Sequence, residues 1–184
     1  MKSKLLLAVI AATIMLIPQP IYAQEKATVS SSETQNPNLK QIGLDSRVKI
    51  LSNYLKQYDS PLAPFAGDFV AMADKYNLDW KLVAAISGVE STFGKEIPSN
   101  SYNAWGWGIY GDNVIRFNSW DEGIATISQG LRDRYMNQLG GEDIYQIGAM
   151  YASSSAWPDH VEHYMNDIQD FALRNPKDTL SISL

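Results

Sequence analysis

Cysteine is absent from the 184-residue sequence, and histidine occurs only twice. The absence of cysteine excludes disulfide bonds, thiolate catalysis, cysteine-based metal sites and lipid attachment through a cysteine. Basic residues are in the minority, because 15 lysines and arginines face 20 aspartates and glutamates. The resulting net charge of −5 argues against nucleic acid as a partner, since positive charge dominates binding to phosphates.

A long apolar run occurs at the start of the chain. Lys2 and Lys4 precede the uncharged residues 5–17, and two prolines then lead to the small residue Ala23. This order of basic, apolar and small residues predicts a secretory signal peptide over residues 1–23. The run is shorter than the ~20 apolar residues of a comfortable membrane span, so an uncut anchor is the weaker alternative. We expect a secreted protein, periplasmic or extracellular, with no membrane contact after cleavage.

Three regions follow the signal peptide. Residues 24–43 are polar and rich in Ser, Thr, Asn and Gln, which predicts a flexible linker. Residues 44–175 are long enough for one domain with a substantial core, and we expect this domain to be monomeric. Residues 176–184 are expected to form a frayed C-terminal tail.

Apolar residues recur at helical spacing in five segments of the domain, which predicts an all-α fold with at most a small β element. Pro64 stands near the start of the second helix, and Asp79 is the expected cap of the third. Ser119 and Glu122 form a capping box before the fourth helix. A shorter helix is predicted over residues 144–151. The apolar stripes are Val48, Leu51, Leu55 and Tyr58; Phe65, Phe69, Met72 and Tyr76; Leu82, Ile86, Val89 and Phe93; Trp120, Ile124, Ile127, Leu131 and Tyr135; and Val161, Tyr164, Ile168 and Phe171, in a helix beginning around Pro158.

One carboxylate, Glu90, stands in an unusual position. It follows Ile86 by four residues and Val89 by one, so it lies on or beside an apolar helix stripe. Partial desolvation there would raise its pKa, as a general acid requires. In glycoside cleavage such an acid protonates the departing oxygen while aromatic faces hold the sugar rings. The alternative is a solvated residue at a helix end.

An irregular segment over residues 94–118 follows this helix and contains glycines and aromatic residues. A long loop in a compact helical domain is usually functional. Within it, residues 114–117 could form a short strand. Trp105, Trp107 and Tyr110 are candidates for stacking on sugar rings, the alternative being that they pack into the core.

Four segments carry a resemblance to a known family. Residues 84–94, AAISGVESTFG, resemble the bacterial peptidoglycan glucosaminidases of autolysins and flagellar-rod hydrolases, and also the soluble lytic transglycosylases, whose helix likewise ends in Glu-Ser. Residues 103–106, NAWG, resemble the Asn-x-Phe-Gly segment of the glucosaminidases. Residues 116–124 are similar to their segment entering the next helix. The last segment resembles their closing Tyr-Ala motif and last helix, and it consists of Tyr151-Ala152 followed by Trp157-Pro158 and then Val161, Tyr164 and Ile168.

The resemblance implies a lysozyme-like fold with Glu90 as catalytic acid and Tyr151 as a substrate-facing residue. It also places Asn103 among the substrate-binding residues, while Ser91 could bind substrate or cap the helix end. The Gly-Leu-Met-Gln run of the transglycosylases is not present, which favours the glucosaminidases. A second carboxylate used by some family members would be Glu96 or Asp112, and the sequence does not choose between them.

The expected function is therefore a peptidoglycan endo-β-N-acetylglucosaminidase acting on glycan strands without a cofactor. A lytic transglycosylase and an inactive wall-binding module are the alternatives. His160 and His163 are spaced to share a metal ion, but no third ligand is evident and we expect none. The same late, polar position of both histidines argues against a Ser–His–Asp triad.

Overall fold

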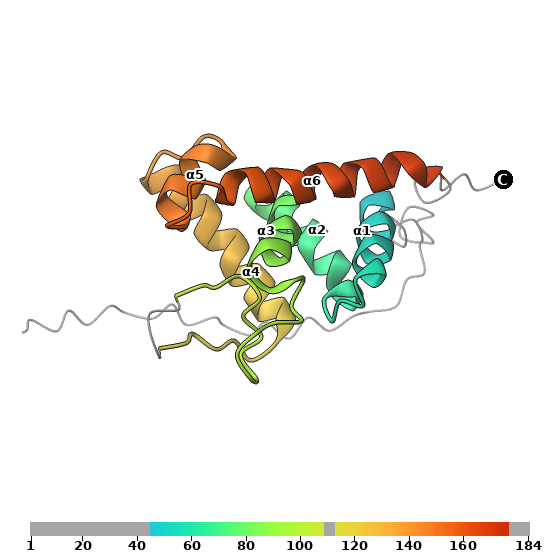
Figure 1. Cartoon of the computed structure of the whole chain (residues 1–184), viewed down its shortest axis with the longest axis horizontal. Helices are drawn as coiled ribbons and strands as arrows, with labels where there is room; N and C mark the ends of the chain where they lie inside the picture. The colour runs from blue at the N-terminus through green and yellow to red at the C-terminus, as the bar shows by residue number, and fades with distance from the viewer. Residues whose placement is uncertain (1–44, 109–112, 177–184) are drawn as a thin grey trace, which may run out of the picture. The chain divides into compact units, whose positions relative to one another are not determined.

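Six α-helices dominate the computed structural model, which describes residues 45–108 and 113–176 (Figure 1). No strand occurs in these two ranges, so the all-α prediction is confirmed. The short strand considered for residues 114–117 is irregular backbone instead, tied at one end by the Phe117 N–H, which donates to the Ser101 carbonyl at 2.8 Å. The helices are α1 (Ser46–Gln57), α2 (Ala66–Tyr76), α3 (Leu82–Ser91), α4 (Trp120–Gly130), α5 (Ile144–Tyr151) and α6 (Trp157–Arg174), with a 3-10 turn η2 (Ala63–Phe65) before α2 and a π-helix η3 (Leu131–Gln138) continuing α4.

The helix ends largely follow the capping signals in the sequence. The Ser119 hydroxyl accepts the Glu122 N–H at 3.4 Å, as expected for the start of α4. Asp143 caps α5 by accepting two backbone N–H groups. The prediction that Asp79 caps α3 is wrong by two residues. Its carboxylate accepts the N–H of Lys81, which itself occupies the cap position of α3 without a side-chain bond.

The core forms around α3. α6 lies across α3 and also packs against α1 and α5 (Figure 1). Every residue of α3 from Leu82 to Gly88 is buried. Burying each large aliphatic side chain contributes about 1.5–3 kcal/mol, so the helix is anchored along most of its length. The fully buried aliphatic residues include Leu51, Leu55, Leu62, Ile86, Ile124, Ile127, Leu131 and Ile147.

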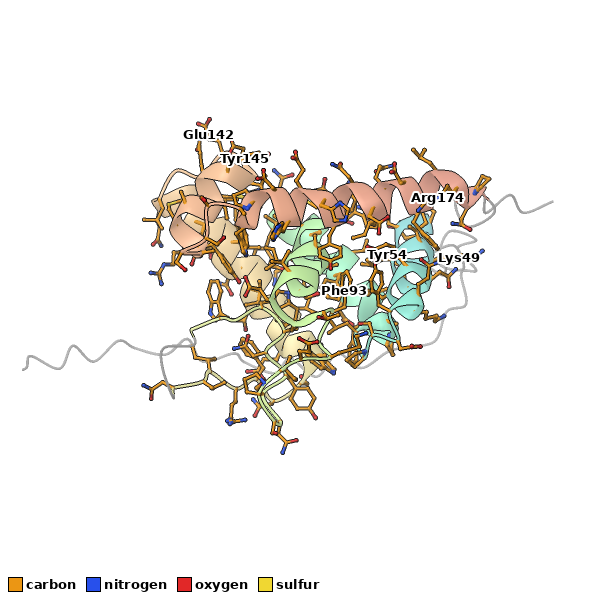
Figure 2. All side chains as sticks on the ribbon, viewed as in Figure 1. Lys49, Tyr54, Phe93, Glu142, Tyr145 and Arg174 are labelled. Carbon is orange, nitrogen blue, oxygen red and sulfur yellow. The ribbon has the colours of Figure 1, made fainter. Side chains whose placement is uncertain are left out.

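The chain leaves α3 through an unusual turn. Thr92, Phe93 and Gly94 have φ angles of 51°, 57° and 82°, three consecutive residues in the left-handed region. The stripe prediction that placed Phe93 on the helix is therefore wrong, although its ring is fully buried and packs edge-on against Tyr54 at 5.8 Å (Figure 2). The Ser60 hydroxyl donates to the Phe93 carbonyl at 2.8 Å. Such backbone strain persists only where the surroundings hold it, so this turn fixes the end of α3.

All described residues belong to one compact unit. The expected signal peptide (1–23) and linker (24–43) lie outside them, as does the tail after Pro176. Among the helices that the structure describes, none combines the length and hydrophobicity needed to cross a membrane.

Candidate active site

Glu90 occupies the last turn of α3, where the helix opens into the strained turn. Its Oε1 accepts a hydrogen bond of 2.6 Å from the indole Nε1 of Trp157, the first residue of α6. Its Oε2 lies against Gly106 in the loop between α3 and α4. A Cβ at position 106 would stand 3.1 Å from that oxygen, and the φ of Gly106 is +62°. The carboxyl is thus held between the start of α6 and the loop.

The pKa of Glu90 is raised by burial and partly lowered again by the hydrogen bond from Trp157. The negative end of the α3 dipole acts in the same direction as burial. Glu90 as a whole is exposed, so the desolvation that raises its pKa affects the carboxyl group and not the whole side chain. The raised pKa expected from the sequence is confirmed in direction, and it favours the protonated form that a general acid needs.

Trp157 belongs to the segment that resembles the last helix of the glucosaminidases, but the sequence did not predict it as a residue of the site. It is 4% exposed, and its ring stacks on Tyr151 with centroids 4.8 Å apart and planes at 21°. Close approach of α5 depends on Gly148, since a Cβ there would reach 3.0 Å from the Trp157 ring. A tryptophan at the start of a helix is normally a core residue. Its one sequence signal was its place just after the Tyr-Ala segment.

Tyr151 ends α5 and is half-buried. Its hydroxyl donates to the Trp105 carbonyl at 2.7 Å, which fastens the loop to α5. Burial raises its pKa well above the usual value, and the nearby negative charge of Glu90 acts in the same direction. The phenol is therefore neutral across the physiological range and next to the acid. Its predicted role in catalysis stays a prediction.

An aromatic cluster, defined as Trp107, Tyr135, Tyr151 and Trp157, adjoins Glu90. Ring centroids are 6.0 Å apart for Trp107 and Tyr135, and 5.4 Å apart for Tyr135 and Tyr151. Trp107 packs on Gly130 at the end of α4, where a Cβ would stand 2.5 Å from the indole. Three of the four rings are half-buried and so retain surface for a ligand, while Trp157 is buried beneath them.

Trp105 does not belong to this surface. It is 0% exposed, its indole N–H donates to the Val83 carbonyl at 2.9 Å, and its ring lies 6.3 Å from that of Phe69. Gly123 of α4 completes its pocket, since a Cβ there would come within 2.8 Å of the indole. The prediction that Trp105 stacks on substrate is corrected, because its faces are enclosed by the core.

Ser91 and Asn103 are also supporting residues. The Ser91 hydroxyl donates to the Ala104 carbonyl at 2.8 Å and accepts the Gly94 N–H at 2.9 Å. Asn103 is 2% exposed, and its amide donates to the Trp107 carbonyl at 2.8 Å while accepting the Trp107 N–H at 3.1 Å. The expected substrate contacts of both residues are corrected. They shape the loop that presents Trp107.

The structure does not assign a role to the remaining residues that the sequence predicted for the site. Tyr110 and Asp112 lie outside the described residues. Glu96 is exposed, and its backbone N–H donates to the Ser91 carbonyl. In the residues that the structure describes, no three His, Cys, Asp or Glu side chains gather as a metal site would need. The identity of a second carboxylate stays open.

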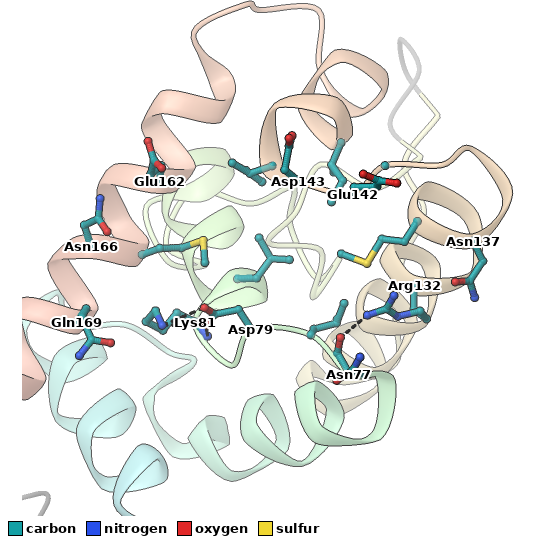
Figure 3. A pocket seen from close by; sticks show the side chains of 17 residues that line it. Asn77, Asp79, Lys81, Arg132, Asn137, Glu142, Asp143, Glu162, Asn166 and Gln169 are labelled. Carbon is teal, nitrogen blue, oxygen red and sulfur yellow. Dashed lines mark hydrogen bonds and ion pairs between the residues drawn. The ribbon is translucent and has the colours of Figure 1, made fainter.

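A cavity of about 730 Å³ opens elsewhere, between the start of α3, η3, α5 and α6 (Figure 3). Its polar groups are largely engaged within the chain. Lys81 pairs with Asp79 at 3.0 Å, and Arg132 donates to the Asn77 carbonyl. Neither Glu90 nor any member of the aromatic cluster lines it. The candidate active site is therefore the surface at Glu90, where the perturbed acid and the rings meet.

Comparison with known proteins adds no relative, since neither a family model nor a curated protein matches the chain.

Proposed function

We propose that the protein is a secreted endo-β-N-acetylglucosaminidase that hydrolyses the glycan strands of bacterial peptidoglycan, with Glu90 as general acid. One observation carries this proposal: a partly desolvated carboxyl, held by the Trp157 indole, stands beside half-buried aromatic rings. The resemblance of residues 84–94 and 103–106 to peptidoglycan glucosaminidases supports the substrate class.

The two oxygens of Glu90 have different surroundings, which suggests different roles. A protonated carboxyl keeps one oxygen as acceptor and carries its proton on the other. Because Trp157 donates to Oε1, that oxygen is the acceptor and Oε2 carries the proton. Oε2 lies against Gly106, a residue with no side chain to cover it. A glycosidic oxygen reaching this point would take the proton as its bond to the anomeric carbon breaks and an oxocarbenium-like state develops.

The second half of the reaction needs a nucleophile at the anomeric carbon. Water attacks either directly or after the acetamido oxygen of the substrate has closed on that carbon, and the Glu90 carboxylate accepts the proton that water releases. The half-buried faces of Trp107 and Tyr135 are suited to sugar rings, since they combine apolar surface with a polar edge. Tyr151 would keep the loop and Trp157 in place through its bond to the Trp105 carbonyl.

A lytic transglycosylase is the second candidate, and one observation favours it. The pKa of Glu90 responds to burial and Trp157, and no other carboxylate of the described residues contributes to it. A single acid that later acts as base is sufficient for transglycosylation, in which a hydroxyl of the substrate itself attacks the anomeric carbon.

Analysis of the products distinguishes these chemistries. Purified peptidoglycan is digested, one half of the digest is reduced with borohydride, and both halves are analysed by mass spectrometry. The proposal predicts fragments with reducing N-acetylglucosamine ends, which take up hydrogen. Fragments ending in 1,6-anhydro-N-acetylmuramic acid, lighter by one water and inert to borohydride, would identify a transglycosylase. Release of no fragments from any wall type would leave a wall-binding module.

A further inference from the structure

A groove of about 310 Å³ lies beside Glu90, between the end of α3 and the first half of α6. The α3 residues that line it precede and follow Glu90 in the sequence. On the α6 side, His160 is three residues after Trp157, which bonds to Glu90. The groove therefore adjoins the candidate active site. Its lining residues are Gly88, Val89, Thr92, His160, His163 and Tyr164.

The chemistry of this groove differs from that of the chain as a whole. The chain has 20 acidic residues, yet the lining contains no carboxylate and both of the chain's histidines. Within the described ranges, neither imidazole has a hydrogen-bond partner, and both histidines are exposed. Their ring N–H groups are therefore available to a ligand.

Thr92 provides an independent sign of function. It is β-branched and has a φ of 51°, a strained conformation for such a residue. Its hydroxyl also has no partner among the residues that the structure describes. Strain of this kind is common at ligand sites, and here it occurs at a residue that lines the same groove as the two imidazoles.

The carboxylates closest in sequence to the two histidines are engaged with tyrosines. Asp159 and Glu162 both accept from the Tyr145 hydroxyl, at 3.1 and 3.0 Å. One turn later Asp167 accepts from Tyr54 at 2.9 Å. On α3 the carboxylate nearest to the groove in sequence is Glu90, whose pKa is raised by burial. The α6 acids are therefore engaged with hydroxyl donors, and none of these carboxylates lines the groove.

We infer that this groove binds a carboxylate of the substrate, with His160 and His163 as donors and the Thr92 hydroxyl as a third contact. The inference rests on the proposed function. In peptidoglycan, carboxylates are carried by the lactyl ether and its attached peptide on alternate sugars, whereas N-acetylglucosamine is neutral. The groove would therefore distinguish wall glycan from an uncharged N-acetylglucosamine polymer.

The two histidines make the test simple, because the chain gives only two imidazole signals in a ¹H–¹³C spectrum. The secreted protein carrying Glu90→Gln is titrated with a disaccharide-peptide from peptidoglycan and, separately, with a neutral N-acetylglucosamine oligosaccharide. Both imidazole signals should move with the acidic ligand and stay in place with the neutral one. Binding that moves the Trp107 indole signal but neither imidazole would overturn the inference and leave the proposed function intact.

A second experiment measures the affinity of variants for the same two ligands. In the Glu90→Gln background, adding His160→Gln and His163→Gln together should weaken binding of the acidic fragment roughly tenfold, since two hydrogen bonds to its carboxylate are lost. Binding of the neutral oligosaccharide should not change. Glu162→Gln is the matched control, because this α6 residue faces the other cavity. Equal weakening for both ligands would contradict the inference. A protein with Glu90 intact that releases nothing from peptidoglycan would contradict the proposed function as well.

Discussion

Replacing Trp157 with phenylalanine removes the indole N–H that bonds to Glu90 and keeps a ring against Tyr151. This bond favours the charged carboxylate, so its loss raises the pKa of Glu90 further. Hydrogen bonds to charged groups contribute about 1.5–3 kcal/mol, and the partial exposure of Glu90 reduces this effect. The acid form then persists to higher pH. The alkaline limb of kcat/KM should therefore move to higher pH.

The assay is the initial rate of fragment release from peptidoglycan, measured from acidic to alkaline pH for the parent and the variant. Trp80→Phe is the matched control, since Trp80 is a half-buried tryptophan whose ring lies under Lys81 rather than near Glu90. Its pH profile should coincide with that of the parent. An alkaline limb that stays in place or moves to lower pH in a folded Trp157→Phe protein would refute the reasoning about Glu90.

Further predictions concern the loop. Gly106→Ala should lower kcat at least tenfold, because the new Cβ crowds Glu90 Oε2 and the φ of +62° becomes strained. Gly140→Ala is the control, since its φ of +74° causes the same strain while no atom lies within 4 Å of the new Cβ. This control should reduce stability and leave kcat unchanged. Trp105→Ala should lower the free energy of unfolding by about 3–5 kcal/mol in a urea titration. Trp107→Ala should instead raise KM with a smaller loss of stability, and equal losses of stability for the two variants would assign Trp107 to the core.

Much of the fold could be predicted because its signals are local. The bounds of α5 were predicted to the residue, since Asp143 accepts two N–H groups at its start and an extended residue, Ala152, ends it. The capping box at Ser119 began α4 as expected. The apolar stripe then ran on to Tyr135, but spacing alone did not distinguish an α-helix from the π-helix η3 that carries Tyr135 to the aromatic cluster.

The site was predicted less completely, because its geometry depends on contacts between distant residues. Glu90 could be found from its helix stripe. Trp105 and Trp107 are two residues apart in a loop without a period, so nothing local indicated that one is buried and the other half-exposed. Their directions are set by Asn103 and by Val83 on α3. Trp157 is 67 residues from its partner Glu90, beyond the reach of any helical pattern.

The central claim is that Glu90 is the general acid, and the most direct measurement is peptidoglycan cleavage by Glu90→Gln. Glutamine keeps an oxygen that can accept the Trp157 N–H, so the fold and wall binding should persist while the transferable proton is lost. The account predicts that the rate falls about 10²–10⁴-fold, with an unchanged melting temperature. Glu142→Gln, an exposed residue at the other cavity, should cleave at the parent rate. A folded Glu90→Gln protein that cleaves as fast as the parent would contradict the account.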